Sequence, residues 1–347
     1  GGAKKEAAIT LHPANRAVKQ RFDETILDAS LRQDVSIPYE CRNGGCGVCK
    51  CTVLAGKVDP GLYQPSALSA EELAQGKVLA CCATALEDCE IEYDASAVRT
   101  NIKEYTAKVV DMMKLTHDVM RVILKLPGND RIPFKAGQYI NIILEDGQRR
   151  AFSFANPPQL GDIIELQIRL MPGGKFTTHV FEGMKVGDPV RFEGPVGDFT
   201  LRESERPIVF VAGATGFAPV KSMVEDAFRR GLKRQIYLYW GVKQLRDLYL
   251  PELPRQWEKE HANFHFIPVL SEAAPEDNWS GRTGMVHEAI LADFPELKGH
   301  EIYACGSVRM VEAIFPFLKA HGAEDGQCFS DAFTLSARSM AYQPPLK

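Results

Sequence analysis

The sequence predicts a multidomain protein of mixed class, in which an α+β segment and an antiparallel β-barrel precede an α/β unit. Its 347 residues exceed the usual size of one hydrophobic core, which indicates two or three domains. Short alternating strands fill the middle of the chain, as is typical of a small antiparallel barrel. Strand and helix patterns alternate after Pro207, as is typical of βαβ units around a parallel sheet.

The composition is that of a globular protein and argues against two classes of partner. Hydrophobic residues make up 45% of the chain and charged residues 25%. The net charge of −4 argues against nucleic-acid binding, which requires a basic surface. The longest apolar run, Pro207–Val220, is short and interrupted by glycine and proline, so we expect no membrane partner. No signal peptide is visible, and we expect a cytoplasmic monomer.

The first expected domain covers residues 8–94 and mixes strands with short helices. Thr25 is a suitable N-cap for one helix. Ser69 is followed three residues later by Glu72, which predicts a capping box at the start of another helix. Residues 95–103 show no strong periodicity, and we interpret them as a linker.

Closely spaced cysteines dominate this first domain. Cys41, Cys46 and Cys49 follow the pattern C-x4-C-x2-C, and a distant fourth cysteine, Cys81, completes the plant-type spacing of a [2Fe–2S] cluster. Glycines at 44, 45 and 47 would allow positive φ and bring backbone N–H groups close to the sulfurs. We therefore predict an iron–sulfur cluster held by Cys41, Cys46, Cys49 and Cys81.

A zinc site and a set of disulfides both fit these cysteines less well than a cluster does. Structural zinc sites usually use two short cysteine pairs, and this chain has one. Disulfides are not expected in a chain with nine cysteines and no signal peptide. Cys82 is the alternative to Cys81, although neighbouring side chains of an extended chain point to opposite faces. Cys51, Cys82 and Cys89 are interpreted as small buried residues.

The second domain, expected over residues 104–204, carries two charged or glycine-rich stretches. Arg150-Ala-Phe152-Ser153 lies between predicted strands, and Gly173-Gly174-Lys175 leads to Thr177. Each alone would pass for an ordinary turn. Together, an arginine fork and the N–H groups of a glycine turn can bind a pyrophosphate. The pair therefore predicts a site for FAD, with the Ser153 hydroxyl directed toward the flavin N5 edge. The expected flavin contacts are Arg150, Phe152, Ser153, Gly173, Gly174, Lys175 and Thr177.

The third domain is expected over residues 205–333. Gly213-Ala-Thr215-Gly216 lies between a buried strand and a helix, where N–H groups and the helix dipole favour phosphate. It is not the G-x-G-x-x-G fingerprint, so a plain tight turn is the alternative. Cys305-Gly306-Ser307 occupies the corresponding turn after a later strand, where the alternative is a buried free cysteine.

The preference between nicotinamides rests on Ser271 and the following Glu272, near a strand end where the adenosine ribose is expected. A carboxylate there would repel the 2′-phosphate of NADPH, which predicts NADH as the donor. Lys243 and Arg246 lie nearby and act in the opposite direction, so NADPH stays open.

Taken together, these motifs occur in the order of a known family. The chain resembles the ferredoxin–FAD–NAD(P)H reductases that supply electrons to bacterial oxygenases and related iron–sulfur enzymes. It is most similar to the CDP-6-deoxy-glucoseen reductase-like branch and to reductases of aromatic dioxygenases, from about residue 8 to Phe333. The motifs that carry the resemblance are Cys41/Cys46/Cys49/Cys81, Arg150-x-Phe-Ser153, Gly174-x-x-Thr177, Gly213-Ala-Thr-Gly-Phe-Ala-Pro219, Tyr239-Trp-Gly241 and Cys305-Gly-Ser307.

The resemblance implies a β-grasp [2Fe–2S] ferredoxin domain, a flavin barrel and a Rossmann-like nucleotide domain. Val-Leu-Ala-Cys81 resembles the segment with the last ferredoxin ligand, and Phe333 matches an aromatic that stacks on the isoalloxazine. Two positions depart from the pattern. Phe152 replaces a tyrosine, and Ala214 replaces a glycine. Residues 334–347 extend beyond the match and are expected to form a C-terminal tail.

The implied function is stepwise electron transfer. NADH passes a hydride to the flavin with Cys305, Ser153 and Phe333 as catalytic residues, and the cluster passes single electrons to a separate oxygenase, hydroxylase, or related iron–sulfur or haem enzyme. The alternatives are a reductase that serves a deoxysugar dehydrase and a redox-sensing flavo-iron–sulfur binding protein. A self-contained flavin hydroxylase finds no support, because no substrate site is recognisable beyond the cofactor motifs.

Overall fold

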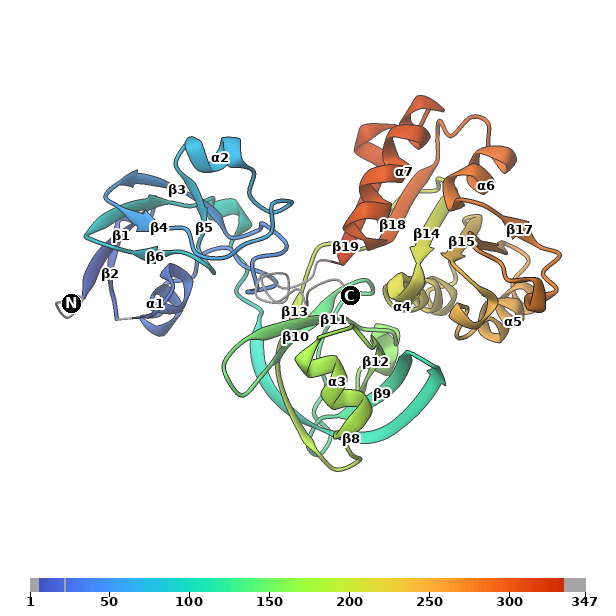
Figure 1. Cartoon of the computed structure of the whole chain (residues 1–347), viewed down its shortest axis with the longest axis horizontal. Helices are drawn as coiled ribbons and strands as arrows, with labels where there is room; N and C mark the ends of the chain where they lie inside the picture. Colours follow the sequence, from blue (N-terminus) through green and yellow to red (C-terminus); the bar gives the residue numbers. More distant parts are fainter. Residues whose placement is uncertain (1–5, 22, 334–347) are drawn as a thin grey trace.

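The computed structural model describes residues 6–21 and 23–333. Figure 1 shows three lobes, which we call the N-terminal lobe (strands β1–β7), the barrel (β8–β13) and the α/β lobe (β14–β19). The predicted multidomain fold class is confirmed. The predicted tail over residues 334–347 lies outside the described residues.

The N-terminal lobe is a β-grasp unit. Its main sheet has the order β2-β1-β7-β3-β5, and β1 and β7 run parallel. Both predicted helix caps are confirmed: Thr25 accepts a hydrogen bond from the Asp28 N–H, and Ser69 and Glu72 form both bonds of the capping box. The elements are β1 (Ala7–His12), β2 (Arg16–Gln20), α1 (Ile26–Arg32), β3 (Lys50–Ala55), β4 (Val58–Asp59), α2 (Ala70–Ala74), β5 (Lys77–Leu79), β6 (Thr84–Ala85) and β7 (Cys89–Glu92).

The barrel is a six-stranded antiparallel sheet of order β11-β10-β13-β8-β9-β12. Its two outer strands approach each other, and the Ala155 N–H donates to the Glu165 carbonyl oxygen at 2.8 Å. The elements are β8 (Lys103–Thr116), β9 (Val119–Lys125), β10 (Tyr139–Ile143), β11 (Arg149–Ser153), β12 (Ile163–Arg169), α3 (Lys175–Glu182) and β13 (Pro189–Val196).

Two local expectations in the barrel were wrong. The Arg150–Ser153 stretch belongs to strand β11 and is not a connection between strands. The chain after Gly173 forms helix α3, where only a glycine turn among strands was expected. The helix forms because it buries Phe176, Thr177 and Val180 on one side, and this apolar spacing is helical.

The α/β lobe has a parallel sheet of order β17-β16-β15-β14-β18-β19. Separate hydrophobic cores, one with α4 and α5 and the other with α6 and α7, cover its two faces. The elements are β14 (Ile208–Gly213), α4 (Phe217–Arg229), β15 (Ile236–Val242), α5 (Glu252–Glu260), β16 (Phe264–Leu270), β17 (Arg282–Thr283), α6 (Val286–Asp293), β18 (Glu301–Ser307), α7 (Val308–Ala320) and β19 (Cys328–Phe333).

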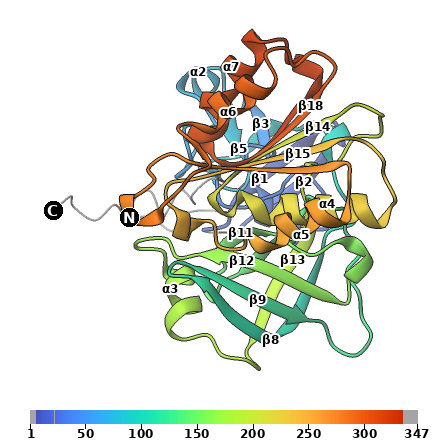
Figure 2. The ribbon, with the colours of Figure 1, turned by 90° about the vertical axis from the view of Figure 1, so that its right-hand side faces the viewer.

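The barrel and the α/β lobe pack closely, as Figure 2 shows. Phe199 of the barrel belongs to the same core as α4 and β14. The Lys221 ammonium on α4 donates to the Ala155 carbonyl oxygen at 3.0 Å and pairs with Glu165 at 3.2 Å. Tyr249 donates to Gln167 at 2.6 Å. These buried polar contacts join the two lobes.

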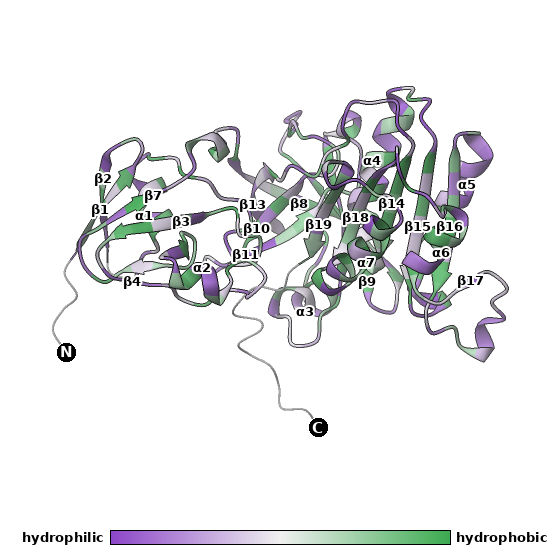
Figure 3. Ribbon diagram, turned by 90° about the horizontal axis from the view of Figure 1, so that it is seen from above, coloured by the Kyte–Doolittle hydropathy of each residue, from purple (hydrophilic) through white to green (hydrophobic). Residues whose placement is uncertain are grey.

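Hydropathy follows the layers of the fold. Apolar segments lie along the sheets and polar segments along loops and outer helix faces (Figure 3). Among the residues that the structure describes, no helix is long and apolar enough to span a bilayer.

Candidate redox centre at the junction of the lobes

The loop after Tyr39 brings predicted cluster ligands together. The Cys41 sulfur accepts hydrogen bonds from the N–H groups of Asn43 (3.4 Å) and Cys46 (3.3 Å), and the Cys46 sulfur accepts one from Val48 (3.4 Å). Cys41 and Cys49 are buried, whereas Cys46 is exposed. Backbone donors directed at sulfur stabilise a negatively charged cluster.

Left-handed backbone shapes this loop at two of the three glycines for which positive φ was predicted, whereas Gly45 does not have positive φ. Gly44 and Gly47 have φ of +79° and +77°. A Cβ on Gly44 would lie 2.9 Å from the Cys82 sulfur, and one on Gly47 would lie 3.0 Å from the Ala67 carbonyl oxygen. Glycine at these positions therefore permits both the turn and its close packing on the chain around Leu62–Ala67.

Cys81 joins this loop from the turn after β5. Its N–H donates to the Cys49 sulfur at 3.5 Å. The Cys81 and Cys82 sulfurs lie only 3.6 Å apart, because the two residues sit in a turn, not in the extended chain that we expected. Cys51 and Cys89 belong to the hydrophobic core of the lobe, as interpreted from the sequence.

The chemistry of these thiols fits a metal cluster. The pKa of the Cys41 thiol is lowered to about 6, chiefly by a hydrogen bond from the Cys46 thiol and also by backbone N–H groups, against the opposing effect of burial. The pKa of Cys49 is raised by its hydrogen bond with Cys81 and by burial. The four thiols are therefore paired with one another, Cys41 with Cys46 and Cys49 with Cys81, in a donor set suited to iron.

The predicted flavin residues lie on or next to two elements, β11 and α3, that contact each other. The ring of Phe152 on β11 packs on Phe176 in the first turn of α3, with 5.6 Å between the ring centroids. Gly174 is the N-cap of α3 and supplies no side-chain cap, so the N–H groups of the first turn face outward from the helix. Thr177 accepts a hydrogen bond from the Met171 N–H, which holds the glycine turn against the helix.

This arrangement fits a pyrophosphate. An uncapped helix N-terminus provides donors and a positive dipole end. Arg150 lies on β11 and the exposed Lys175 lies on α3. The contact between Phe152 and Phe176 holds these two elements together. Ser153 is buried at the end of β11, opposite Tyr139 of β10.

The predicted nucleotide turns also lie against each other. A Cβ on Gly216 would lie 2.1 Å from the Cys305 carbonyl oxygen, and one on Gly213 would lie 2.4 Å from the Met310 sulfur. A Cβ on Gly306 would also lie close to Met310, 3.2 Å from the same sulfur. Ala214, in the short 3-10 turn Ala214–Gly216, has φ of +47°, a conformation that glycine adopts more readily.

Ser271 and its neighbours lie at the same carboxyl edge of the sheet. The Ser271 N–H donates to the Val242 carbonyl oxygen at 2.9 Å, and the Glu272 N–H donates to Lys243 at 2.8 Å. Glu272 and Lys243 are both exposed. In parallel α/β sheets, ligands bind at this edge.

All three lobes meet around Glu40. The Tyr139 hydroxyl of the barrel donates to the Glu40 carboxylate at 3.0 Å. The pKa of Glu40 is raised to about 7, chiefly by burial and also by the charges of Asp198, Asp331 and Cys41, against the opposing effect of the Tyr139 hydrogen bond. Asp331 lies on β19 opposite Cys305. The cysteine loop therefore lies against β10, the strand paired with the flavin strand β11, and near Asp331 of β19.

Sequence reasoning missed this junction. Glu40 precedes the first cysteine, and Tyr139 and Asn141 alternate along β10, but nothing local indicates that they touch. Asp331 was noted only as part of the segment that ends at Phe333. Contacts between residues about a hundred positions apart leave no signal in a single sequence.

Comparison with known proteins matches each lobe separately. Residues 9–86 match the 2Fe-2S iron-sulfur cluster binding domain. Residues 106–201 match the oxidoreductase FAD-binding domain, and residues 210–315 match the oxidoreductase NAD-binding domain.

Whole-length relatives have the same organisation. The chain is 38% identical over 330 residues to the CDP-6-deoxy-L-threo-D-glycero-4-hexulose-3-dehydrase reductase of Yersinia pestis, covering 94% of this chain and 98% of the relative. It is 36% identical over 338 residues to the reductase component of phenol 2-monooxygenase from Pseudomonas sp. strain CF600, covering 95% of each.

A solved structure has the same overall fold as this chain. The ferredoxin reductase in carbazole 1,9a-dioxygenase superposes with a TM-score of 0.76 at 26% identity, over 96% of this chain and 100% of that one. The chain therefore belongs to the family of NAD(P)H-dependent electron-transfer reductases that join a 2Fe-2S domain, an FAD-binding domain and an NAD-binding domain in one polypeptide.

Proposed function

We propose that this reductase passes electrons from NADH, through FAD and a [2Fe–2S] cluster, to a separate oxygenase or hydroxylase component. The observation that carries the proposal is the contact of Glu40, beside the cysteine loop, with Tyr139 on β10, the strand paired with the flavin strand β11. Asp331 of β19 lies close enough for its charge to raise the pKa of Glu40. Relatives named as reductase components of phenol 2-monooxygenase and terephthalate 1,2-dioxygenase support this class of acceptor.

The chain's own residues bind and orient the cofactors. Arg150, Lys175 and the first turn of α3 hold the FAD pyrophosphate. Ser153 orients the flavin edge, and Phe333 at the end of β19 covers the ring. When bound, nicotinamide supplies a hydride, FAD takes it and releases single electrons, and the cluster carries them onward.

The two nucleotide turns bind the nicotinamide dinucleotide, which is the electron donor. The N–H groups of Gly213–Gly216 bind the nicotinamide dinucleotide phosphates, and Cys305 and Gly306 position the nicotinamide at the carboxyl end of β18. Ser271 receives the adenosine ribose. Cys41, Cys46, Cys49 and Cys81 hold the iron. The exposed Cys46 places one edge of that site at the surface, where a partner protein can dock.

A deoxysugar dehydrase is the second candidate acceptor. The 38% identity to the Yersinia pestis dehydrase reductase, over 98% of that protein, favours it. Oxygenase and dehydrase require the same delivery of single electrons, so the reductase chemistry is common to both. None of the nine cysteines, all of which lie within the described residues, forms a disulfide, which supports a reducing compartment, here proposed to be the cytoplasm. The protein is further proposed to act as a monomer.

The function is tested by following electrons to two artificial acceptors. Ferricyanide accepts from the flavin, whereas cytochrome c reports transfer through the cluster. We expect NADH to drive both reductions, with a higher kcat/KM than NADPH because the exposed Glu272 repels a 2′-phosphate. Reduction of ferricyanide without cytochrome c would contradict the route through the cluster, and an equal kcat/KM with NADPH would contradict the nucleotide preference.

A further inference from the structure

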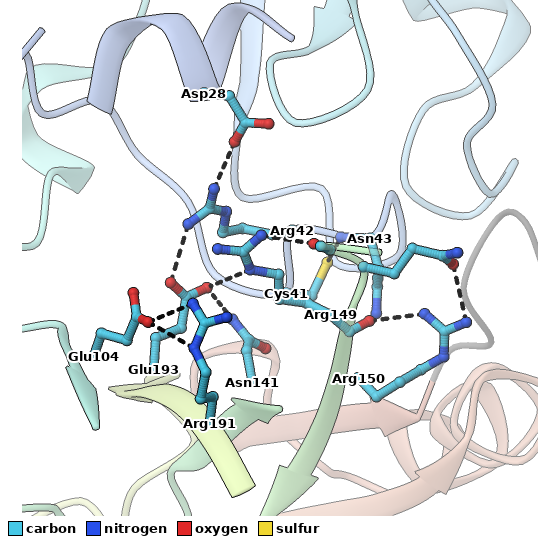
Figure 4. Close-up of polar contacts among 12 residues, drawn as sticks. Asp28, Cys41, Arg42, Asn43, Glu104, Asn141, Arg149, Arg150, Arg191 and Glu193 are labelled. Carbon is cyan, nitrogen blue, oxygen red and sulfur yellow. Dashed lines mark hydrogen bonds and ion pairs between the residues drawn. The ribbon is translucent and has the colours of Figure 1, made fainter. Parts of the chain in front are cut away.

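The N-terminal lobe meets the barrel through a cluster of charged side chains (Figure 4). Arg42 follows the predicted ligand Cys41 directly in the chain. Its guanidinium pairs with Glu193 on β13 of the barrel at 3.0 Å and with Asp28 of its own lobe at 2.5 Å. The side chains of Arg42 and Glu193 are only 11% and 7% exposed, so solvent screens this pair weakly.

Glu193 also interacts with the guanidinium of Arg149 and the side-chain amide of Asn141. Arg149 on β11 lies 3.4 Å from one carboxylate oxygen, and Asn141 on β10 donates to the same oxygen at 3.3 Å. Burial lowers the pKa of Arg149, and the positive charge of Arg42 lowers it further. Two guanidinium groups from different lobes are therefore close enough to repel each other, and the Glu193 carboxylate between them compensates both.

The backbone of Arg42 is itself held in a costly conformation. Its φ is +54°, a region that non-glycine residues enter only when surrounding contacts fix them there. Arg42 also lies over the Tyr39 ring, 5.5 Å from the centroid. The ion pair with Glu193 is thus one of the contacts that define the shape of the cysteine loop.

The same contacts lead directly to the flavin strand. Asn141 donates to the Glu40 carbonyl oxygen, and Tyr139 donates to the Glu40 carboxylate. Tyr139 pairs with Ser153 in the β10–β11 register, and Asn141 pairs with Glu193 in the β10–β13 register. Strand β10 therefore contacts Glu40, which precedes the first predicted cluster ligand, and Glu193, which pairs with Arg42 after it. The same strand lies beside β11, which carries predicted flavin residues.

We propose that Glu193 is a positioning residue for electron transfer from the flavin to the cluster. Acting through Arg42, it fixes the cysteine loop on the barrel and sets the separation of the two redox groups. The step moves one electron, so the flavin is oxidised and the cluster is reduced; Glu193 gives and receives neither electron nor proton. The inference rests on the proposed function and adds the residue that positions the cluster relative to the flavin.

The test compares Glu193→Gln with Glu104→Gln in the full-length holoprotein. Glu104 lies on β8 and pairs with Arg191, which is on the same strand, β13, as Glu193. The side chains of Glu104 and Arg191 are both more than half exposed, and ion pairs this exposed contribute little to stability. For each variant we would measure iron and FAD content, flavin reduction by NADH in a stopped-flow instrument, and the ratio of cytochrome c to ferricyanide reduction.

Glu193→Gln should keep iron and FAD and reduce its flavin at the wild-type rate within about twofold. Its cytochrome c to ferricyanide ratio should fall by roughly tenfold or more, since ångström-scale misplacement of reacting groups has effects of this size. Arg42→Gln combined with Glu193→Gln should lower the ratio by less than the product of the two single effects, because both substitutions remove the same Arg42–Glu193 ion pair. Glu104→Gln should behave as wild type.

Small-angle X-ray scattering of the same holoprotein gives a readout that is independent of turnover. Glu193→Gln should increase the radius of gyration, and Glu104→Gln should not. An unchanged acceptor ratio or unchanged scattering in Glu193→Gln would overturn the positioning role, and so would loss of iron, which would assign Glu193 to cluster retention. Failure of the wild type to reduce cytochrome c would instead refute the proposed function.

Discussion

At the scale of single residues, Cys81 and Cys82 are adjacent, yet Cys81 is the one that contacts Cys49. The sequence favoured Cys81 from its spacing, and the additional argument from extended-chain geometry was wrong because the pair lies in a turn. A turn places both sulfurs on nearly the same side, 3.6 Å apart. The distinction between them therefore depends on the hydrogen bond to Cys49.

The pair gives a direct prediction for the ligand. Cys81→Ala should lose the cluster, because one iron would lack a thiolate. Cys82→Ala should retain iron and lose roughly 1 kcal/mol of stability, as for a small, partly buried group. Iron per chain, measured by chelation and by the electron paramagnetic resonance of the reduced protein, distinguishes the two. If Cys82→Ala is the variant without iron, the ligand assignment is reversed.

Asp331 predicts a pH dependence of stability. Burial, together with the negative charge of the Asp198 carboxylate, raises the pKa of its carboxyl to about 7. The folded protein therefore binds this proton more tightly than the unfolded chain. The resulting stabilisation is complete below the ordinary aspartate pKa, declines as the pH rises toward about 7, and is absent above it.

The comparison is between wild type and Asp331→Asn across this pH range. The Tm of the wild type relative to the variant should be highest near pH 5 and decrease by pH 8, when the buried carboxylate must ionise. Asp162→Asn, a change at an exposed loop position, controls for the loss of one charge. A Tm difference that does not vary with pH would show that Asp331 does not titrate in this range.

At the scale of elements, the features predicted correctly from the sequence are those that depend on residues close together in the chain. Thr25 and Ser69 cap helices because their hydroxyls bond to N–H groups within three residues. The parallel strands were recognised from their buried runs. Helix α3 was missed because its two glycines suggested a turn, and its apolar side becomes evident only against the barrel. The contacts of Glu193 with Arg42 and Arg149 join separate elements and leave no local pattern.

The turn between β14 and α4 gives a prediction at this scale. Gly216→Ala would place a Cβ 2.1 Å from the Cys305 carbonyl oxygen, so the two nucleotide turns must separate. We expect a loss of about 1–3 kcal/mol, typical of overpacking, together with slower flavin reduction by NADH. Iron content should not change, because the N-terminal lobe has its own core.

Gly326→Ala is the matched control. A Cβ at Gly326 would meet nothing within 4 Å, so this variant should retain both stability and NADH reactivity. Urea unfolding of the two variants, followed by near-ultraviolet circular dichroism, measures the difference. Equal stability of the two would mean that the β14–α4 turn can move away from β18 without cost.

At the scale of the whole molecule, the lobes are joined in two different ways. The barrel and the α/β lobe share a hydrophobic core and buried hydrogen bonds. The N-terminal lobe meets the barrel through polar and charged groups around Arg42 and Glu40. This division matches the proposed path. Hydride transfer would take place between the α/β lobe and the barrel, and single-electron transfer would cross from the barrel to the N-terminal lobe.

An anaerobic titration with NADH follows the whole proposed electron path in a single experiment. FAD takes two electrons and the cluster one, while each NADH supplies two. We expect the flavin and cluster absorbance to bleach together, with bleaching complete at about 1.5 equivalents of NADH per chain. Bleaching that ends at about one equivalent, with the cluster spectrum unchanged, would show that the cluster is not connected to the flavin and would refute the proposed path.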